Sequence, residues 1–524
     1  MTILKHSRRM LCGAAVMAIG TFAALPASAA QFTCPNEGGD MVFGQEAQVA
    51  GLDMHFSSAI SARNVAMHIY ETLMTRGEDN SPIHELAESH EVSDDGLTYT
   101  FKLRPGITFH NGKEMTSADV LASYERYQRI GIDRAALEPV ASMSAPDPST
   151  FVIELKNKVP VYAEHLTSSA APISIPPAEE AVKEANQIEY IGTGPYKFAE
   201  WVPDGFVRLE RFDDYVPNTA FENETGFGGY KVACFDTVTF RIVKEPGARV
   251  AGLETGELQG VEDVPTKAAE RLADNPDIKL LPVENWWIHI AVVNQSSPPT
   301  DNLAVRKAIQ VGLDMEEIME IATDGAYTLN HGFQYPGNPY FVEGGKEWYN
   351  VNDKERAKQY LAEAGYDGEP VVLLTNSDYT NMYNAALVMS EQLKDIGINA
   401  ELKVVDWPTS RQERDNTNAW NMFFTGFGTG PSIGPQGAVV DLVQPANLSR
   451  ATEDPELDDA WSRMQLDETQ EGRKAAFNDV QTIFYEDVYA IVMGDIQKVQ
   501  GVRSNVQGFV PFRIPRLWNV WFEG

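Results

Sequence analysis

One short segment of this 524-residue chain has the spacing of a serine nucleophile. Gly430-Pro431-Ser432-Ile433-Gly434 fits G-x-S-x-G, the pattern that holds a nucleophilic serine at a strand-to-helix turn in α/β hydrolases. That chemistry needs a helix directly after the serine and a histidine later in the chain. Pro435 and Gly437 follow instead, and the last histidine is His331. The pattern favours a glycine-rich loop, and an exported serine hydrolase using Ser432 is the remote alternative.

Other residue types that carry chemistry are scattered. The histidines show no H-x-x-x-H spacing, and the chain contains neither a P-loop nor a dinucleotide-binding fingerprint. We therefore expect no catalytic residues, no metal and no cofactor, and we predict that the protein is not an enzyme.

The first 30 residues have the pattern of a cleavable signal peptide. Lys5, Arg8 and Arg9 precede an apolar run over 10–25, and Ala27-Ser28-Ala29 fits a cleavage site. We expect export to the periplasm of a Gram-negative cell. Arg8-Arg9 leaves open whether the Sec or the Tat route is used.

Two cysteines, Cys34 and Cys234, follow this signal. An exported chain folds in an oxidising compartment, where two cysteines tend to pair, so we predict a Cys34–Cys234 disulfide. Two buried free thiols are the alternative, and a redox or chaperone-like role is a third hypothesis for the chain.

The composition is strongly acidic. The formal net charge is −33, which repels nucleic acid and anionic membrane surfaces. With 43% hydrophobic residues the chain can bury a large core, and its length suggests more than one lobe. We expect a protein that binds no nucleic acid.

Strand-like and helix-like segments alternate throughout, which indicates an α/β fold. Residues 97–103 alternate with period two and predict a strand, and a further strand is expected from Ile107 to His110. Thr116 or Ser117 is expected to cap a helix that runs to about Arg126.

The clearest unit lies in the C-terminal half. Residues 370–375 predict a buried strand, 381–396 a helix with Leu387, Leu393 and Ile396 inward, and 398–404 a second strand. Gly397 suits the left-handed position after the helix. A further strand over 420–427 ends at the glycine-rich loop, and ligands of open α/β sheets bind beyond the carboxyl ends of strands.

Several separated motifs carry a resemblance. They are Leu86-Ala87-Glu88 with Asp95-Gly96-Leu97 and Phe101, Leu103-Arg104-Pro105-Gly106 with Phe109-His110-Asn111-Gly112, Gly192-Thr193-Gly194-Pro195-Tyr196 with Trp201 and Tyr215, and Val305-Arg306-Lys307-Ala308-Ile309 with Asp314. In this order the chain resembles extracytoplasmic solute-binding proteins of the peptide/nickel class, which serve ABC importers. The match spans nearly the whole chain after residue 30.

The resemblance implies a two-lobed periplasmic-binding-protein fold (type II-like, cluster C) with an extra domain inserted in the first lobe. It assigns 31–70, 190–286 and 491–524 to lobe I, 71–189 to the inserted domain and 287–490 to lobe II. The chain should cross between lobes near 284–294 and 491–500, and the lobes should close over a ligand by a hinge motion.

The resemblance also implies a ligand site. Glu46 matches a ligand-contacting glutamate, Trp407 a pocket tryptophan, Arg414 a basic residue, and Gly426-Phe427 an aromatic–glycine pair. Residue types add stacking faces on Trp286, Trp287 and Phe424, of which neighbours on a strand should face opposite sides, and a carboxylate clamp of Arg411 and Arg414. The predicted ligand-binding residues are Glu46, Trp286, Trp287, Trp407, Arg411, Arg414, Phe424, Phe427, Gly428 and Gly430.

Two positions depart from peptide-binding relatives. Gly430 stands where they carry an aspartate for the peptide ammonium, and Phe424 where some have arginine. A peptide with a free amine then needs another acid, such as Glu46 or Asp441. We predict a monomeric receptor that delivers a peptide-like or other small polar solute to an ABC permease. The alternative ligand is a non-peptide, such as an oligosaccharide or an opine.

Overall fold

The computed structural model describes residues 31–524 except 58, 80, 161 and 429–453. Its main sheet follows the order β17-β16-β18-β14-β19-β13-β1-β12-β9-β8, with β15 paired to β19. The strands are β1 (Asp40–Gln45), β8 (Tyr196–Val202), β9 (Phe206–Arg211), β12 (Thr237–Ile242), β13 (Gly260–Val261), β14 (Ile278–Val293), β15 (Tyr327–Thr328), β16 (Val371–Asn376), β17 (Ala400–Val405), β18 (Met422–Phe427) and β19 (Ala490–Arg503).

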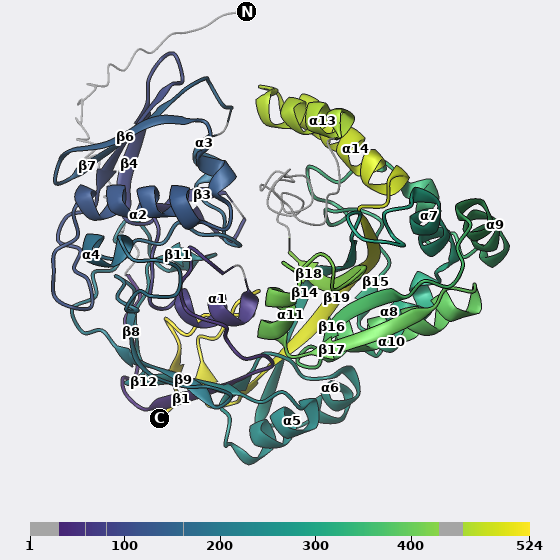
Figure 1. The fold of residues 1–524 in the computed structure, drawn as a ribbon. Helices are drawn as coiled ribbons and strands as arrows, with labels where there is room; N and C mark the ends of the chain where they lie inside the picture. Colours follow the sequence, from purple (N-terminus) through teal and green to yellow (C-terminus); the bar gives the residue numbers. More distant parts are fainter. Residues whose placement is uncertain (1–30, 58, 80, 161, 429–453) are drawn as a thin grey trace, which may run out of the picture.

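Two long strands connect the halves of the molecule. β14 and β19 pair antiparallel from Ile278↔Arg503 to Val292↔Ala490. At one end β19 pairs with β13, and at the other β14 pairs with β18. Figure 1 shows both strands passing from one half to the other, in agreement with the crossings predicted over 284–294 and 491–500.

The first half contains a separate four-stranded sheet of order β4-β5-β7-β6. Its elements are β4 (Ala87–Val92), β5 (Thr98–Leu103), α2 (Ser117–Ile130), β6 (Val140–Asp147) and β7 (Thr150–Leu155), and it has its own core of residues between 73 and 175. The predicted strand over 97–103 is β5. The predicted helix is α2, and Thr116 and Asp119 form its capping box.

The strand expected over 107–110 does not form. The structure has only an isolated bridge between Thr108 and Glu114 there. Asn111-Gly112 turns the chain so soon after Ile107 that only one pair of residues can meet across the turn, which is too few for a ladder.

The strand–helix–strand unit predicted in the second half forms, with its two strands parallel. β16 and β17 pair in parallel, with Val371 opposite Ala400, and α10 (Thr380–Asp395) connects them. Gly397 has φ +98°. The prediction that Leu387 points inward is wrong, because it is 40% exposed. The buried face of α10 instead follows Met382, Ala385, Ala386 and Met389, at helical spacing toward Leu393.

The remaining described helices cover the sheet and its edges. They are α1 (Ile60–Ala66), α3 (Tyr162–His165), α4 (Ala178–Ala181), α5 (Pro246–Thr255), α6 (Thr266–Leu272), α7 (Leu303–Gly312), α8 (Met315–Thr323), α9 (Lys354–Ala364), α11 (Trp407–Glu413), α13 (Pro455–Leu466) and α14 (Gln470–Glu486). No helix among the described residues is both long and apolar enough to span a bilayer.

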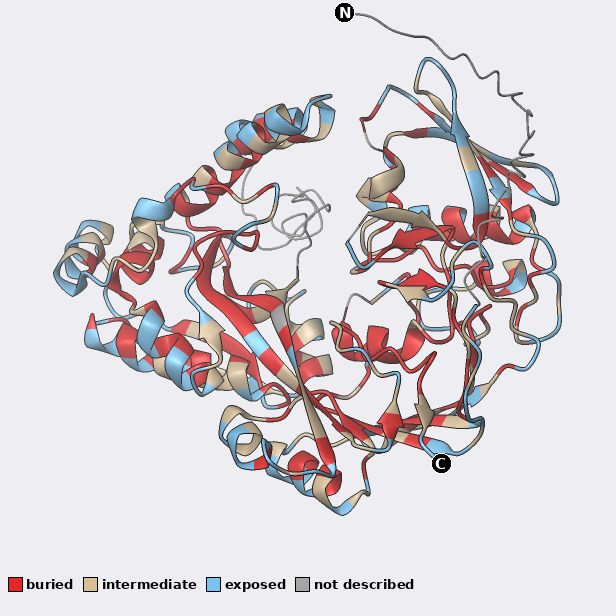
Figure 2. Ribbon diagram, turned by 180° about the vertical axis from the view of Figure 1, so that it is seen from behind, coloured by how far each residue is buried: buried red, intermediate tan, exposed pale blue. Residues whose placement is uncertain are grey.

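Buried residues form several separate cores, as Figure 2 shows in red. The largest core joins residues from 283 to 496 with Ala47 and Ile60. A second lies within 73–175, and a third combines residues from 41–70, 188–240 and 502–520. The domain boundaries stay a prediction.

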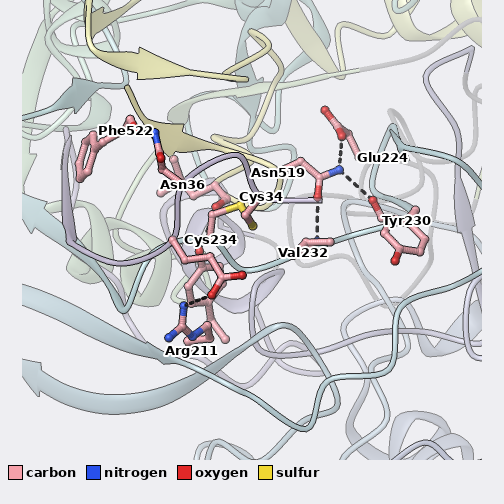
Figure 3. Close-up of a disulfide and its surroundings, with 12 residues drawn as sticks. Cys34, Asn36, Arg211, Glu224, Tyr230, Val232, Cys234, Asn519 and Phe522 are labelled. Carbon is pink, nitrogen blue, oxygen red and sulfur yellow. Dashed lines mark hydrogen bonds and ion pairs between the residues drawn. A yellow bond between two sulfur atoms is a disulfide. The ribbon is translucent and has the colours of Figure 1, made fainter. Parts of the chain in front are cut away.

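Cys34 and Cys234 lie bonded in the structure. Their sulfur atoms are 2.00 Å apart, and 200 residues separate them in the chain. Figure 3 shows the bridge beside the C-terminal segment, where Asn36 donates a hydrogen bond to the carbonyl oxygen of Phe522 at 3.0 Å. The bridge therefore ties the start of the described chain to the segment that leads into β12.

Candidate functional site

A cavity of about 460 Å³ lies between the two halves of the molecule. One wall comes from residues 50–63, 130–134, 170 and 186, and the other from 287–292, 379–382 and 407–428. Its size lies within the range that small-molecule sites occupy. Because the two walls come from segments on either side of the crossing strands β14 and β19, movement of one half against the other would enclose a ligand in this cavity.

Aromatic rings form a continuous row along the second wall. Trp287 meets Tyr379 edge-on at 5.6 Å between ring centroids, and Tyr379 meets Trp407 at 5.3 Å. Trp407 stacks on Phe423 at 6.4 Å, and Phe423 contacts Trp420 at 6.0 Å. All five rings line the cavity. Flat apolar faces of this kind suit a ligand with a hydrophobic or sugar-like surface.

Strand geometry decides which aromatic residues reach the cavity. On β18, Phe423, Thr425 and Phe427 line it, whereas Phe424 is fully buried on the opposite face. The split expected for neighbouring rings is therefore observed, but Phe423 takes the place that we assigned to Phe424.

The same alternation separates the two tryptophans of β14. Trp287 lines the cavity, whereas Trp286 does not and is fully buried. Ile290 and Val292 line the cavity as well, and they lie opposite Thr425 and Phe423 of β18.

Glu46 does not line the cavity. It is 6% exposed and forms ion pairs with Lys498 at 2.6 Å and Arg249 at 3.2 Å. Burial alone would raise the pKa of Glu46, but the charges of Lys498 and Arg249 hold the pKa below its ordinary value. Since these cations already satisfy its carboxylate, we leave Glu46, with Trp286 and Phe424, out of the candidate site.

Two further acids complete this buried cluster. Glu262 forms no ion pair with a described residue, and its carboxylate accepts hydrogen bonds from the backbone N–H of Glu46 at 3.2 Å and from the side-chain amide of Asn64 at 3.1 Å. Burial raises the pKa of Glu262, and burial also raises the pKa of Asp263 to about 6. The three acids and two cations lie at the point where β19 enters the first half.

Arg411 and Arg414 both line the cavity from α11 and its C-terminal cap. They stand three residues apart, so they lie on one side of the helix. The guanidinium of Arg411 lies 5.8 Å from the Trp407 ring centroid, and Arg414 lies 3.8 Å from Asp415. The structure thus brings both predicted arginines to the aromatic row.

Glycines at the end of β18 make room for larger side chains. A Cβ on Gly426 would come within 2.7 Å of the Trp287 indole, and one on Gly428 would collide with the guanidinium of Arg513. The predicted residues Phe427 and Gly428 line the cavity. Gly430, Ser432 and Asp441 lie outside the described residues.

Sequence reasoning missed Arg63 and Arg513, which line the cavity from the first half. Arg63 lies on the short helix α1, between Ala62 and Asn64, and Arg513 lies in a C-terminal segment without regular periodicity. No local pattern marks either residue. Tyr379 was missed as well, because its place before α10 looks like an ordinary helix start.

The described residues contain no group of three or more histidine, cysteine or acidic side chains that could hold a metal ion. The cavity therefore offers aromatic faces, arginine side chains and backbone groups. Such a surface can bind and orient a solute.

The chain matches a known protein family. Residues 81–447 match the model of "Bacterial extracellular solute-binding proteins, family 5 Middle". This chain is a family 5 solute-binding protein. It is a receptor of the kind that serves ABC importers, as the resemblance implied.

Curated relatives agree over most of their length. The "Probable peptide ABC transporter periplasmic-binding protein y4tO" of Sinorhizobium fredii (strain NBRC 101917 / NGR234) is 28% identical to this family 5 protein, covering 87% of this chain and 88% of the relative. The "Glutathione-binding protein GsiB" of Salmonella typhi is 27% identical, covering 79% of this chain and 78% of GsiB.

Solved structures share the two-lobed α/β fold. AgaA from A. tumefacien R10, in complex with agropinic acid, matches with TM-score 0.80 and 25% identity over 93% of this chain and 99% of AgaA. A dipeptide-binding protein from pseudoalteromonas sp. SM9913, in complex with Met-Leu, matches with TM-score 0.82 and 21% identity over 93% of this chain and 100% of that protein. The predicted fold class is confirmed.

Proposed function

We propose that this family 5 protein captures a small polar solute in its interlobe cavity and delivers it to the membrane subunits of an ABC importer. The observation that carries the proposal is the cavity of about 460 Å³ whose walls come from both halves at the crossing of β14 and β19. A solute that contacts both walls favours the closed arrangement, which is the form that a permease can distinguish from the empty receptor.

The solute is peptide-like, or a non-peptide metabolite with comparable polar groups. Relatives support both classes, since GsiB is named for glutathione and the AgaA structure contains agropinic acid. The aromatic row provides stacking surface for either class. The arginines of the cavity provide donors for carboxylates or hydroxyls.

The proposal includes the cellular setting. Residues 1–30 are removed as a signal peptide, the mature chain works in the periplasm as a monomer, and the Cys34–Cys234 bridge forms after export. The protein acts by binding and performs no covalent chemistry. Curated relatives named as periplasmic-binding proteins support this setting.

Mass spectrometry of the molecule released from purified, denatured protein tests the proposal. We expect one retained solute, and we expect the same solute to raise the melting temperature of ligand-free protein by mass action. Ser432→Ala is the control for the hydrolase alternative, because it should leave the affinity for that solute unchanged. A folded protein that binds no solute, or one that chemically converts it, would contradict the proposal.

A further inference from the structure

We propose that the solute carries a carboxylate or a similar oxyanion, and that Arg63 and Arg513 of the first half bind this group. The inference rests on the proposed function and narrows its ligand to one chemical class. It depends on two guanidinium groups that line the cavity and form no ion pair with any described residue.

Arg63 is held inside the first half by α1. Its side chain is 6% exposed, and its Nη1 donates to the carbonyl oxygen of Ser169 at 2.8 Å. Its Nε is buried and has no hydrogen-bond partner. One wall of the cavity thus contains a buried cation whose described contacts include only a neutral acceptor.

Arg513 reaches the same cavity from the C-terminal segment. Its guanidinium packs against Gly428, where only a glycine leaves space for it, and its Nε is likewise buried without a partner. Burial, and then the like charge of Arg513, lower the pKa of Arg63 to about 9. The two cations are therefore close enough to repel each other, and an anion between them would relieve the repulsion.

Several other buried arginines of this chain have acidic partners, whereas Arg306 donates to the backbone carbonyls of Thr300, Asp301 and Asp487. Arg126 forms a two-pronged pair with Asp53 at 2.9 and 2.6 Å, and Arg249 pairs with Glu46. The chain has 75 acidic residues against 42 basic ones, so carboxylates are abundant. Leaving a buried charge unpaired costs stability, and a ligand that supplies the missing anion offsets this cost when it binds.

Other residues that line the cavity also offer hydrogen-bond donors, as an anionic ligand requires. Trp287 and Trp407 line the cavity, and their indole Nε1 atoms are buried N–H donors that have no partner among the described residues. Among the described lining residues only Asp415 is acidic, and it already lies beside Arg414. The described part of the surface therefore presents donors that need acceptors, and none of its residues is an acid placed for a ligand ammonium group.

The first test identifies the charge of the retained solute. The molecule released from wild-type protein should carry at least one carboxylate, phosphate or sulfate. Two pairs of probes then compare acids with neutral analogues on ligand-free protein: Met-Leu with its C-terminal amide, and glutathione with its diethyl ester. In each pair that binds, the acid should bind at least about tenfold more tightly, because a charge-assisted hydrogen bond is lost in the analogue.

The second test uses Arg63→Gln and Arg513→Gln. Each should weaken binding of the retained solute by about tenfold to hundredfold, and Arg63→Lys should recover part of this loss. Without ligand, each glutamine variant should melt at a temperature equal to or above that of wild type, since Arg63→Gln removes a buried charge and Arg513→Gln a half-buried one, neither of which has an ion pair with a described residue. Arg271→Gln is the control, because Arg271 is exposed and pairs with Glu254 at 2.6 Å far from the cavity.

The outcomes separate the two proposals. A neutral or cationic solute, or equal retention by the glutamine variants, overturns the anion site and leaves the receptor function intact. A large loss of ligand-free stability in both glutamine variants also overturns it, because the arginines would then act within the fold. Failure of folded wild-type protein to retain a solute or respond to either pair of probes overturns the receptor function itself.

Discussion

The ammonium of Lys498 lies 2.6 Å from a carboxylate oxygen of Glu46, although 452 residues separate the two in the chain. The same ammonium lies 5.1 Å and 5.2 Å from the ring centroids of Trp286 and Trp287. Lys498, which lies on the crossing strand β19, therefore contacts both Glu46 of the first half and the ring of Trp287 in the cavity wall. This contact places a charged cluster directly behind the aromatic row.

Lys498→Met should destabilise the protein by about 3–5 kcal/mol at pH 8, because it leaves Glu46, Glu262 and Asp263 with Arg249 as their cation. This loss of stability should become smaller toward pH 5, because the three acids take up protons there in the variant. Urea unfolding at the two pH values measures it. Lys267→Met, which breaks an exposed pair with Asp324, is the control. An equal loss of stability at both pH values would contradict the role of Lys498 as the cation that neutralises these acids.

Asp495→Asn should remove a pH dependence of stability. Burial raises the pKa of Asp495 to about 7, and Asn330 is its described side-chain donor at 3.0 Å. Because this pKa is higher than the unfolded value of 3.8, the native state keeps a proton, and wild-type stability falls as pH rises toward 7.

The asparagine variant should therefore match wild type near pH 4 and exceed it by about 4 kcal/mol at pH 8, following about 1.4 kcal/mol for each unit of pKa. Chemical denaturation at several pH values gives the difference. Asp277→Asn, at an exposed position, is the control. A constant offset between wild type and Asp495→Asn across this range would show that the carboxyl does not titrate as described.

Trp407→Ala and Phe427→Ala should each weaken binding of the retained solute by at least about tenfold, since each removes stacking surface from the cavity. Trp407 is 5% exposed, so its truncation should also cost about 3–5 kcal/mol of stability while the protein stays folded. Calorimetric titration measures the affinity. Trp201→Ala, at a partly buried residue that packs against the core of the first half, is the control that lowers stability alone. Unchanged affinity in both variants would reject this wall as the binding surface.

Gly428→Ala should displace the guanidinium of Arg513 and reduce affinity for an anionic solute by about tenfold, in line with loss of one charge-assisted contact. Gly247→Ala is the matched control, because a Cβ there meets its nearest atom at 3.6 Å and fits without movement. Titration of both variants with the retained solute decides the matter. If Gly428→Ala kept the wild-type affinity, the position of the Arg513 guanidinium beside Gly428 would not matter for binding.

Cys34→Ser with Cys234→Ser should lower the free energy of unfolding by about 4 kcal/mol, because the bridge closes a loop of 200 residues in the unfolded chain. Thermal melts of the double variant and of oxidised and fully reduced wild type measure it. The reduced wild type should melt with the double variant. Equal melting of all three samples would mean that the bridge adds nothing.

The sequence by itself determined the family, the α/β class and the elements whose pattern is local. The β16–α10–β17 unit, the capped start of α2 and the pairing of Cys34 with Cys234 follow from alternation, capping residues and the export signal. These features depend on neighbours in the chain or on composition, so they can be recognised without a structure.

Only the tertiary structure decided which side chains form the site. Pairing with β18 places Ile290 opposite Thr425, and the phase of β18 puts Phe423 rather than Phe424 in the cavity. Glu46 pairs with a residue 452 positions away, and Arg63 and Arg513, which are far apart in the chain, line the same cavity. Such contacts depend on packing between distant segments, and a pattern of neighbouring residues does not record them.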